Sequence, residues 1–205
     1  MTVTQQTGSH CGPAVLQLLY SHYKQSFSQD QIVRAAENIK KIKKNGTQPA
    51  QLAKAVSKLT PDMQFWFKQL TKMSDLDALV NTYHIPVGIN WKGLFYNSIE
   101  EEQMVQRRGD RGHYSVVIGV DLAENTITIQ DTYEEFAQKP RTFPLDWFKK
   151  RWKDSTEDLN ELTGKEEVIA TRRFAFIIAP KDASFPLELS MQGPDKLEDL
   201  RLPTF

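Results

Sequence analysis

The chain has 205 residues, of which 26 are Lys or Arg and 26 are Asp or Glu, so its formal net charge at pH 7 is zero. With 40% hydrophobic and 25% charged residues, it has the composition of a globular protein long enough to bury a sizeable core. The balanced charge excludes a global attraction to nucleic acid or to an anionic membrane, and the apolar runs are far too short for membrane insertion.

Targeting and redox signals are few. No secretory apolar segment precedes Gln5, and we therefore expect a cytoplasmic protein. The single cysteine, Cys11, has no partner for an internal disulfide.

The first predicted helix begins at Cys11 and covers residues 11–24. Gly12 and Pro13 suit a tight helix entry, because the missing N–H of proline has no intrahelical partner in the first turn. The exposed N–H groups and partial positive charge of a helix N-terminus favour a thiolate. Cys11 is therefore a candidate nucleophile. The alternative is an inert buried thiol, which is the more common role of a free cysteine.

Helical patterns dominate the first half of the chain, and strands dominate the second. Further helices are predicted at 28–39, with Ser28 as its cap, and at 48–59, 74–83 and 143–152, the last with its aromatic side chains in the core. Strands are predicted at 63–68, 85–91, 112–121, 125–131 and 168–179. This order indicates an α+β domain with a mostly antiparallel sheet.

His113 is the candidate base for a cysteine nucleophile, because it opens the apolar run 112–121 that forms a hairpin with 125–131. The other three histidines are expected to be surface or packing residues: His10, His22 and His84. Side chains alternate between the two faces of a strand, so register decides which residues can meet His113.

The hairpin places Asp131 near His113 if its turn is 122–124 and Asp121 pairs with Asn125. Ser115 then lies opposite Asp131, and His113 becomes the diagonal neighbour of Asp131 on the same face. Asp131 is thus expected to accept the ring N–H of His113. A slip of one residue would put the two on opposite faces.

Gln5 lies six residues before Cys11. An acyl-transfer nucleophile needs donors for the oxygen that becomes negative in the tetrahedral intermediate. The side-chain amide of Gln5 and the backbone N–H of Cys11 would supply two such donors.

These motifs resemble the papain-like cysteine peptidases and, within them, the C39-like families. Their N-terminal signature is a Gln, five residues of any kind, and then Cys-Gly-Pro-Ala, which matches residues 5–14 without a gap. The second signature is Gly-His-Tyr, an apolar strand, a turn and a strand that ends in Asp, commonly followed by Pro. Residues 112–114 and Asp131 match, whereas Thr132 stands where proline is common.

The resemblance implies a role for each residue. Gln5 would be the oxyanion-hole donor, Cys11 the nucleophile, His113 the general base and acid, and Asp131 the residue that orients His113. It also implies a papain-like α+β fold, in which an N-terminal helix carrying the nucleophile packs on a mostly antiparallel sheet carrying the histidine and the aspartate.

The match covers residues 1–180, which we take as the catalytic domain, and leaves 181–205 as a C-terminal extension that wraps the surface or is mobile. No cofactor is implied. A metal held by Cys11 and His113 would lack a third ligand. The connection 92–111 is long enough for a lid or a binding loop, or it forms a solvated helix and turn.

The resulting expectation is a cysteine hydrolase, a peptidase above all, that acts on a peptide or another amide. One alternative is an amide hydrolase or acyl transferase with the same four residues. The other is a catalytically silent binding module of the same fold. The oligomeric state is left open.

Overall fold

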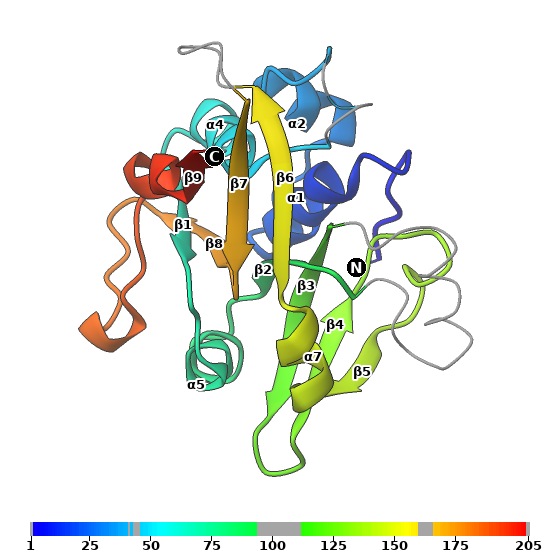
Figure 1. Cartoon of the computed structure of the whole chain (residues 1–205), viewed down its shortest axis with the longest axis vertical. Helices are drawn as coiled ribbons and strands as arrows, with labels where there is room; N and C mark the ends of the chain where they lie inside the picture. The colour runs from blue at the N-terminus through cyan, green and yellow to red at the C-terminus, as the bar shows by residue number, and fades with distance from the viewer. Residues whose placement is uncertain (1, 41, 43–45, 94–111, 160–165, 204–205) are drawn as a thin grey trace.

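The structure is a computed structural model that describes residues 2–40, 42, 46–93, 112–159 and 166–203 (Figure 1). Its α-helices are α1 (Cys11–His22), α2 (Gln29–Ala35), α4 (Pro49–Leu59), α5 (Met73–Asp77) and α7 (Leu145–Arg151). The structure also has a π-helical turn, η1 (Ala78–Thr82), and two 3-10 helices among the described residues, η2 (Leu187–Leu189) and η3 (Pro194–Leu200). The strands are β1 (Met63–Lys68), β2 (Val87–Trp91), β3 (His113–Asp121), β4 (Thr126–Gln130), β5 (Arg141–Pro144), β6 (Lys153–Leu159), β7 (Glu166–Arg172), β8 (Ala175–Pro180) and β9 (Arg201–Pro203).

Six strands form one antiparallel sheet in the order β1-β8-β2-β3-β4-β5. A second antiparallel sheet has the order β6-β7-β9. In Figure 1, α1, α2 and α4 lie together in the upper half of the view, whereas α5 and α7 lie in the lower half. The central strand β2 is buried along its whole length, because both faces of the six-stranded sheet are covered.

Two hydrophobic clusters lie on the two faces of this sheet. One joins α1, α2 and α4 to β1 and β8, and Leu16, Leu52 and Phe176 are among its fully buried members. The other joins α5, η1 and α7 to β2, β3 and β4 around Trp91 and Trp152. Burial of each such side chain stabilises the fold by about 1.5–3 kcal/mol.

Local sequence explains where several elements begin. Ser28 caps α2, since its hydroxyl accepts the N–H of Gln31 while the Gln31 side chain accepts the N–H of Ser28, a complete capping box. The predicted strand at 63–68 is confirmed residue for residue as β1. The predicted helix at 48–59 is confirmed from Pro49 onward.

Four predictions of secondary structure are wrong in detail. The helix predicted at 28–39 ends at Ala35, shortly before Glu37, which adopts a left-handed φ of 55°. The single strand predicted at 168–179 is two strands in different sheets, because Arg173 adopts a left-handed φ of 46° and turns the chain between β7 and β8. The helix predicted at 74–83 is α5 followed by the π-helical turn η1. The helix predicted at 143–152 is shortened to α7, since Phe143 belongs to strand β5.

The aromatic residues of that last segment are mostly in the core, as predicted. Phe143, Phe148 and Trp152 are buried, whereas Trp147 is 41% exposed, contrary to the prediction. Strands β5, β6 and β9 lie outside the predicted strands.

Residues after β8 contact the rest of the fold. Gln192 pairs with Phe67 at the outer edge of β1, and β9 pairs with β7. Leu197 on η3 belongs to the same buried cluster as α1. The predicted loop 92–111 lies outside the described residues except for 92 and 93.

Candidate active site

Cys11 is the first residue of α1 and is buried, with 8% of its surface exposed. The start of the helix is packed closely, because a Cβ on Gly12 would lie 3.2 Å from both Leu52 Cδ2 and Thr47 Cβ. A glycine at this position therefore lets the thiol-bearing turn approach α4. No side-chain hydrogen bond caps the helix N-terminus, and Cys11 lies at this partially positive end of α1.

His10, predicted to be a surface or packing residue, is half-buried. Its Nδ1 lies 2.5 Å from Thr7 Oγ1, within the turn that precedes α1. Burial lowers the pKa of His10 below 6.5, and Asp30 opposes this in part. His22 and His84 are exposed, as predicted for surface residues.

The β3-β4 hairpin changes register within its length. The predicted pairing of Asp121 with Asn125 is wrong, because Asp121 pairs with Thr126. A β-bulge at Ile118 then inserts one extra residue into β3, between Val117 and Gly119.

Beyond the bulge, Val116 pairs with Gln130, so the next position of the ladder sets Ser115 opposite Asp131. This is the register that the sequence predicted at this end of the hairpin. His113 Nε2 lies 2.8 Å from Asp131 Oδ1, and both side chains are buried. The bulge thus compensates for the longer turn and keeps the two residues on one face.

The Asp131 carboxylate has no exposed surface and accepts five hydrogen bonds. Besides His113, its donors are the backbone N–H of Thr132 at 2.7 Å, the backbone N–H of Tyr133 at 2.8 Å, Ser115 Oγ at 3.1 Å and Arg141 Nη2 at 3.1 Å. Ser115 Oγ itself accepts from Trp91 Nε1 at 3.0 Å, so its hydrogen is directed at Asp131. A buried charge is tolerated when it is paired and hydrogen-bonded in this way.

These contacts set the ionisation of both residues. Burial alone would raise the pKa of Asp131, but the charge and hydrogen bond of His113, the Arg141 guanidinium and the Tyr133 N–H lower it to about 2. Burial alone would lower the pKa of His113, but Asp131 and, to a smaller extent, a hydrogen bond and charge from Cys11 raise it to about 10. At neutral pH the site therefore holds an imidazolium and a carboxylate.

His113 lies between Asp131 and Cys11. Its Nε2 is engaged by Asp131, and a hydrogen bond and charge from Cys11 also act on the ring. The ring orientation is thus fixed from both sides.

Gln5 is buried beside the start of α1. Its Nε2 donates to the Thr7 carbonyl at 2.8 Å, and the backbone N–H of His10 donates to the same oxygen at 3.0 Å. Gln5 Nε2 and the backbone nitrogen of His10, the residue before Cys11, therefore share one acceptor. Nε2 has two N–H groups, of which the hydrogen bonds among the described residues use one.

The structure thus brings together the four residues singled out in the sequence: Gln5, Cys11, His113 and Asp131. Arg141, Trp91 and Ser115 had no predicted role at this site. Arg141 follows Asp131 by ten residues, across an irregular segment that has no periodicity. Within the part of the chain that the structure describes, no three His, Cys, Asp or Glu side chains gather as metal ligands would, and no helix is long and apolar enough to cross a membrane.

Comparison with protein families matches residues 2–158 to the Peptidase C39 like family. No curated protein matches the sequence. Among solved structures, the peptidase domain of Streptococcus ComA, a bifunctional ABC transporter involved in a quorum sensing pathway, is similar with a TM-score of 0.54 and 20% identity, over 88% of this chain and 98% of that one.

Two other structures are similar at 14% identity. A double glycine motif protease from an AMS/PCAT transporter, solved in complex with a leader peptide, has a TM-score of 0.52 over 88% of this chain and 91% of its own. A proposed C39-like peptidase from Bacillus anthracis has a TM-score of 0.54 over 88% and 96%. At these identities the similarity establishes the fold, and it confirms the predicted papain-like α+β architecture.

Proposed function

This chain belongs to the Peptidase C39 like family, and we propose that it is a cysteine peptidase with Cys11 as nucleophile, His113 as general acid and base, Asp131 as orienting residue and Gln5 as oxyanion-hole donor. The observation that carries the proposal is the position of His113, hydrogen-bonded on one side to Asp131 and on the other to Cys11. This is the arrangement of nucleophile, base and orienting group that covalent acyl transfer requires.

The reaction begins with Cys11 as a thiolate, stabilised by the His113 imidazolium and the N-terminus of α1. Sγ attacks the carbonyl carbon of the scissile amide, and the carbonyl oxygen becomes negative. The second N–H of Gln5 Nε2 and the backbone N–H of Cys11 stabilise that oxygen.

Collapse of the tetrahedral intermediate breaks the C–N bond. His113 gives its proton to the leaving nitrogen, so the amine departs neutral and a thioester remains on Cys11. The neutral imidazole then takes a proton from water, whose oxygen attacks the thioester. The acid is released, and the thiolate and imidazolium form again. Asp131 stays ionised throughout and fixes the ring.

A peptide is the substrate class that the comparisons favour, because one of the similar structures was solved with a leader peptide bound. The fold similarity extends over 88% of this chain. An acyl transferase would use the same four residues and differ in the group that accepts the acyl chain.

The test is reaction with a peptide carrying an electrophilic carbonyl, followed by incubation of the protein with peptides and a panel of amine acceptors. We expect labelling at Cys11 that is lost in Cys11→Ser and His113→Ala and kept in His22→Ala, whose target is an exposed histidine. Release of hydrolysed fragments alone establishes a peptidase. Acyl products on the amines indicate a transferase, and labelling no faster than that of an unstructured cysteine peptide indicates a silent module.

A further inference from the structure

Gln29, the first residue of α2, has a side chain that is buried and hydrogen-bonded to the N-terminal segment. Its Oε1 accepts the backbone N–H of Gln6 at 2.9 Å, and its Nε2 donates to the carbonyl of Thr4 at 2.9 Å. The two backbone groups flank Gln5. The Gln29 amide therefore pairs with this segment as the peptide unit of a neighbouring strand would.

The orientation of the Gln29 amide is determined by its partners. Nε2 also donates to Gln17 Oε1 on α1 at 3.2 Å, so both of its N–H groups are used. The backbone partners are one fixed donor and one fixed acceptor, and a flipped amide would face each with the wrong atom. This position therefore requires the length of a glutamine side chain and both the acceptor and the donors of its amide.

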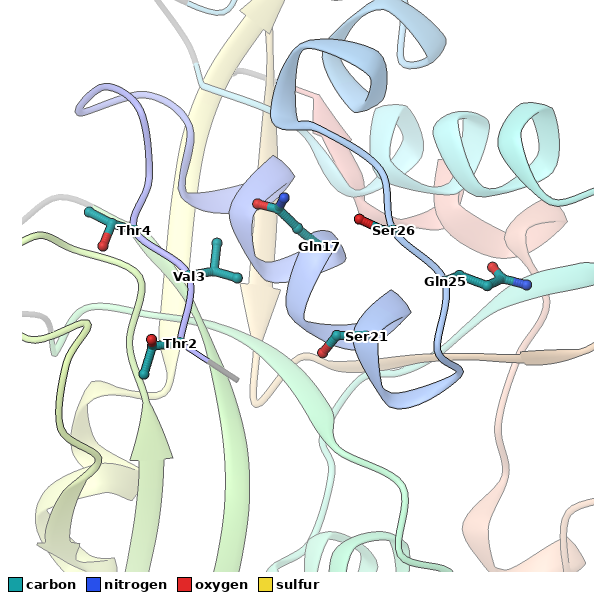
Figure 2. A pocket seen from close by; sticks show the side chains of 7 residues that line it. All are labelled: Thr2, Val3, Thr4, Gln17, Ser21, Gln25 and Ser26. Carbon is teal, nitrogen blue, oxygen red and sulfur yellow. The ribbon is translucent and has the colours of Figure 1, made fainter.

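A pocket between the N-terminal segment and α1 is lined by Thr2, Val3, Thr4, Gln17, Ser21, Gln25 and Ser26, and Figure 2 shows the Val3 side chain directed towards α1. The pocket has a volume of about 270 Å³. Val3 packs in the buried cluster that includes α1, whereas Thr2 and Thr4 beside it are exposed, so packing anchors only part of the segment. Hydrogen bonds with the Gln29 side chain on one side and with the Thr132 carbonyl on the other also hold the backbone around Gln5.

We infer that Gln29 is a positioning residue for the oxyanion hole, which keeps residues 4–6 in the place where the Gln5 amide meets the reacting oxygen. The inference rests on the proposed function. Gln29 acts through Gln5 and has no contact of its own with the substrate.

The experiment compares two reactions of Cys11 in Gln29→Met, a variant of similar length that loses these hydrogen bonds. Acylation by p-nitrophenyl acetate forms an S–C bond through a negative oxygen, breaks the C–O bond and releases p-nitrophenolate. Iodoacetamide alkylates the same sulfur by displacing iodide at a saturated carbon, without an oxyanion. We expect acylation to slow by about tenfold and alkylation to change by less than about twofold, since only the first reaction uses the oxyanion hole.

Gln31→Met is the matched control, because Gln31 lies on the same helix and loses one comparable hydrogen bond, to the N–H of Ser28, away from residues 4–6. It should leave both rates unchanged. In a Gln5→Ala background, Gln29→Met should cause no further loss of acylation, because the two residues act through one group. Equal slowing of both reactions, or additive losses, would overturn the inference.

Failure of the proposed function can be distinguished from failure of the inference about Gln29. If the wild-type thiol acylates no faster than an unstructured cysteine peptide, the peptidase proposal fails, and amide hydrogen exchange then decides the role of Gln29. The N–H of Gln5 donates to Thr132 and not to Gln29. Its exchange should nevertheless speed up in Gln29→Met, and unchanged exchange overturns the inference. Should that variant fail to fold, Gln29→Glu keeps the acceptor for Gln6, loses the donor to Thr4, and takes its place.

Discussion

Thr132 and Gln5 are joined by two hydrogen bonds, one through the backbone and one through the side chains. The Gln5 N–H donates to the Thr132 carbonyl at 2.8 Å, and Thr132 Oγ1 donates to Gln5 Oε1 at 3.2 Å. The N–H of Thr132 donates in turn to Asp131 at 2.7 Å. Thr132 therefore connects the oxyanion-hole candidate to the residue that orients His113.

This contact explains what a threonine does at a position where the resembling families commonly have proline. A proline has no N–H for Asp131 and no hydroxyl for Gln5. In this chain both groups are used, so the Gln5 amide is oriented by Thr132 as well as by Thr7.

Thr132→Val should lower the kcat of peptide hydrolysis by about two- to tenfold with little change in KM, the range expected for one neutral hydrogen bond that orients a donor. Thr132→Ser keeps the hydroxyl and should retain most of the rate. Steady-state kinetics of the two variants provides the test. A serine variant as slow as the valine variant would show that the methyl group, and not the hydroxyl, matters.

Gln5→Ala should lower kcat by about 10²–10³-fold with a small effect on KM, because the amide acts on the negative oxygen of the transition state. Gln6→Ala is the control, since the Gln6 side chain is exposed and its backbone N–H, which bonds Gln29, is kept. The measurement is kcat and KM for both variants. An unchanged kcat in Gln5→Ala would remove Gln5 from the oxyanion hole.

The sequence predicted the contact between His113 and Asp131 for a reason that was only partly right. Period-two alternation and the Ser115 to Asp131 register hold at the open end of the hairpin. The turn is one residue longer than expected, and only the bulge at Ile118 restores the register. Gly119 lies beside the bulge, and an isolated glycine within a strand pattern is the one signal that could have indicated it.

Other parts of the site depend on contacts between distant segments, which periodicity does not reveal. Arg141 reaches Asp131 from the edge strand β5, and its guanidinium lies 3.9 Å from the centre of the Phe136 ring. Gln29 reaches residues 4–6 from another helix. Motif spacing identified the reacting groups, whereas their supporting residues required the tertiary structure.

Arg141→Met should destabilise the protein most near neutral pH and make its stability less dependent on pH in the acid range. The guanidinium favours the ionised form of Asp131, whose pKa is about 2, so its loss should raise that pKa towards the ordinary value. A carboxyl with a lowered pKa contributes stability above the unfolded pKa and loses it as the pH falls through the folded pKa. Because the folded and unfolded pKa values of Asp131 then lie closer together, Arg141→Met should lose less free energy of unfolding than the wild type as the pH falls from 7 to 2.

Denaturant unfolding between pH 2 and 7 measures this shift. Arg141→Lys keeps a positive charge, so the pH dependence of its free energy of unfolding should stay closer to that of the wild type. It lacks the planar group that lies over Phe136. Parallel pH profiles for the wild type and Arg141→Met would show that Arg141 contributes packing alone.

Asp131→Asn should make the free energy of unfolding less dependent on pH in the alkaline range. Folding raises the pKa of His113 from 6.5 to about 10, chiefly through the Asp131 carboxylate. A group whose pKa is raised on folding contributes stability that is complete below the unfolded pKa and is lost as the pH rises through the folded pKa. The wild type should therefore lose free energy of unfolding between about pH 6.5 and 10, and Asp131→Asn should lose less, because an amide does not stabilise the imidazolium by charge.

The measurement is the difference between the two proteins in denaturant unfolding at several pH values from 6 to 10, which cancels the titration of lysines and tyrosines common to both. Direct NMR titration of the His113 ring provides an independent value for the same shift. A difference that stays constant over this range would mean that His113 is neutral in the folded wild type, and the proposed thiolate would then lack its imidazolium partner.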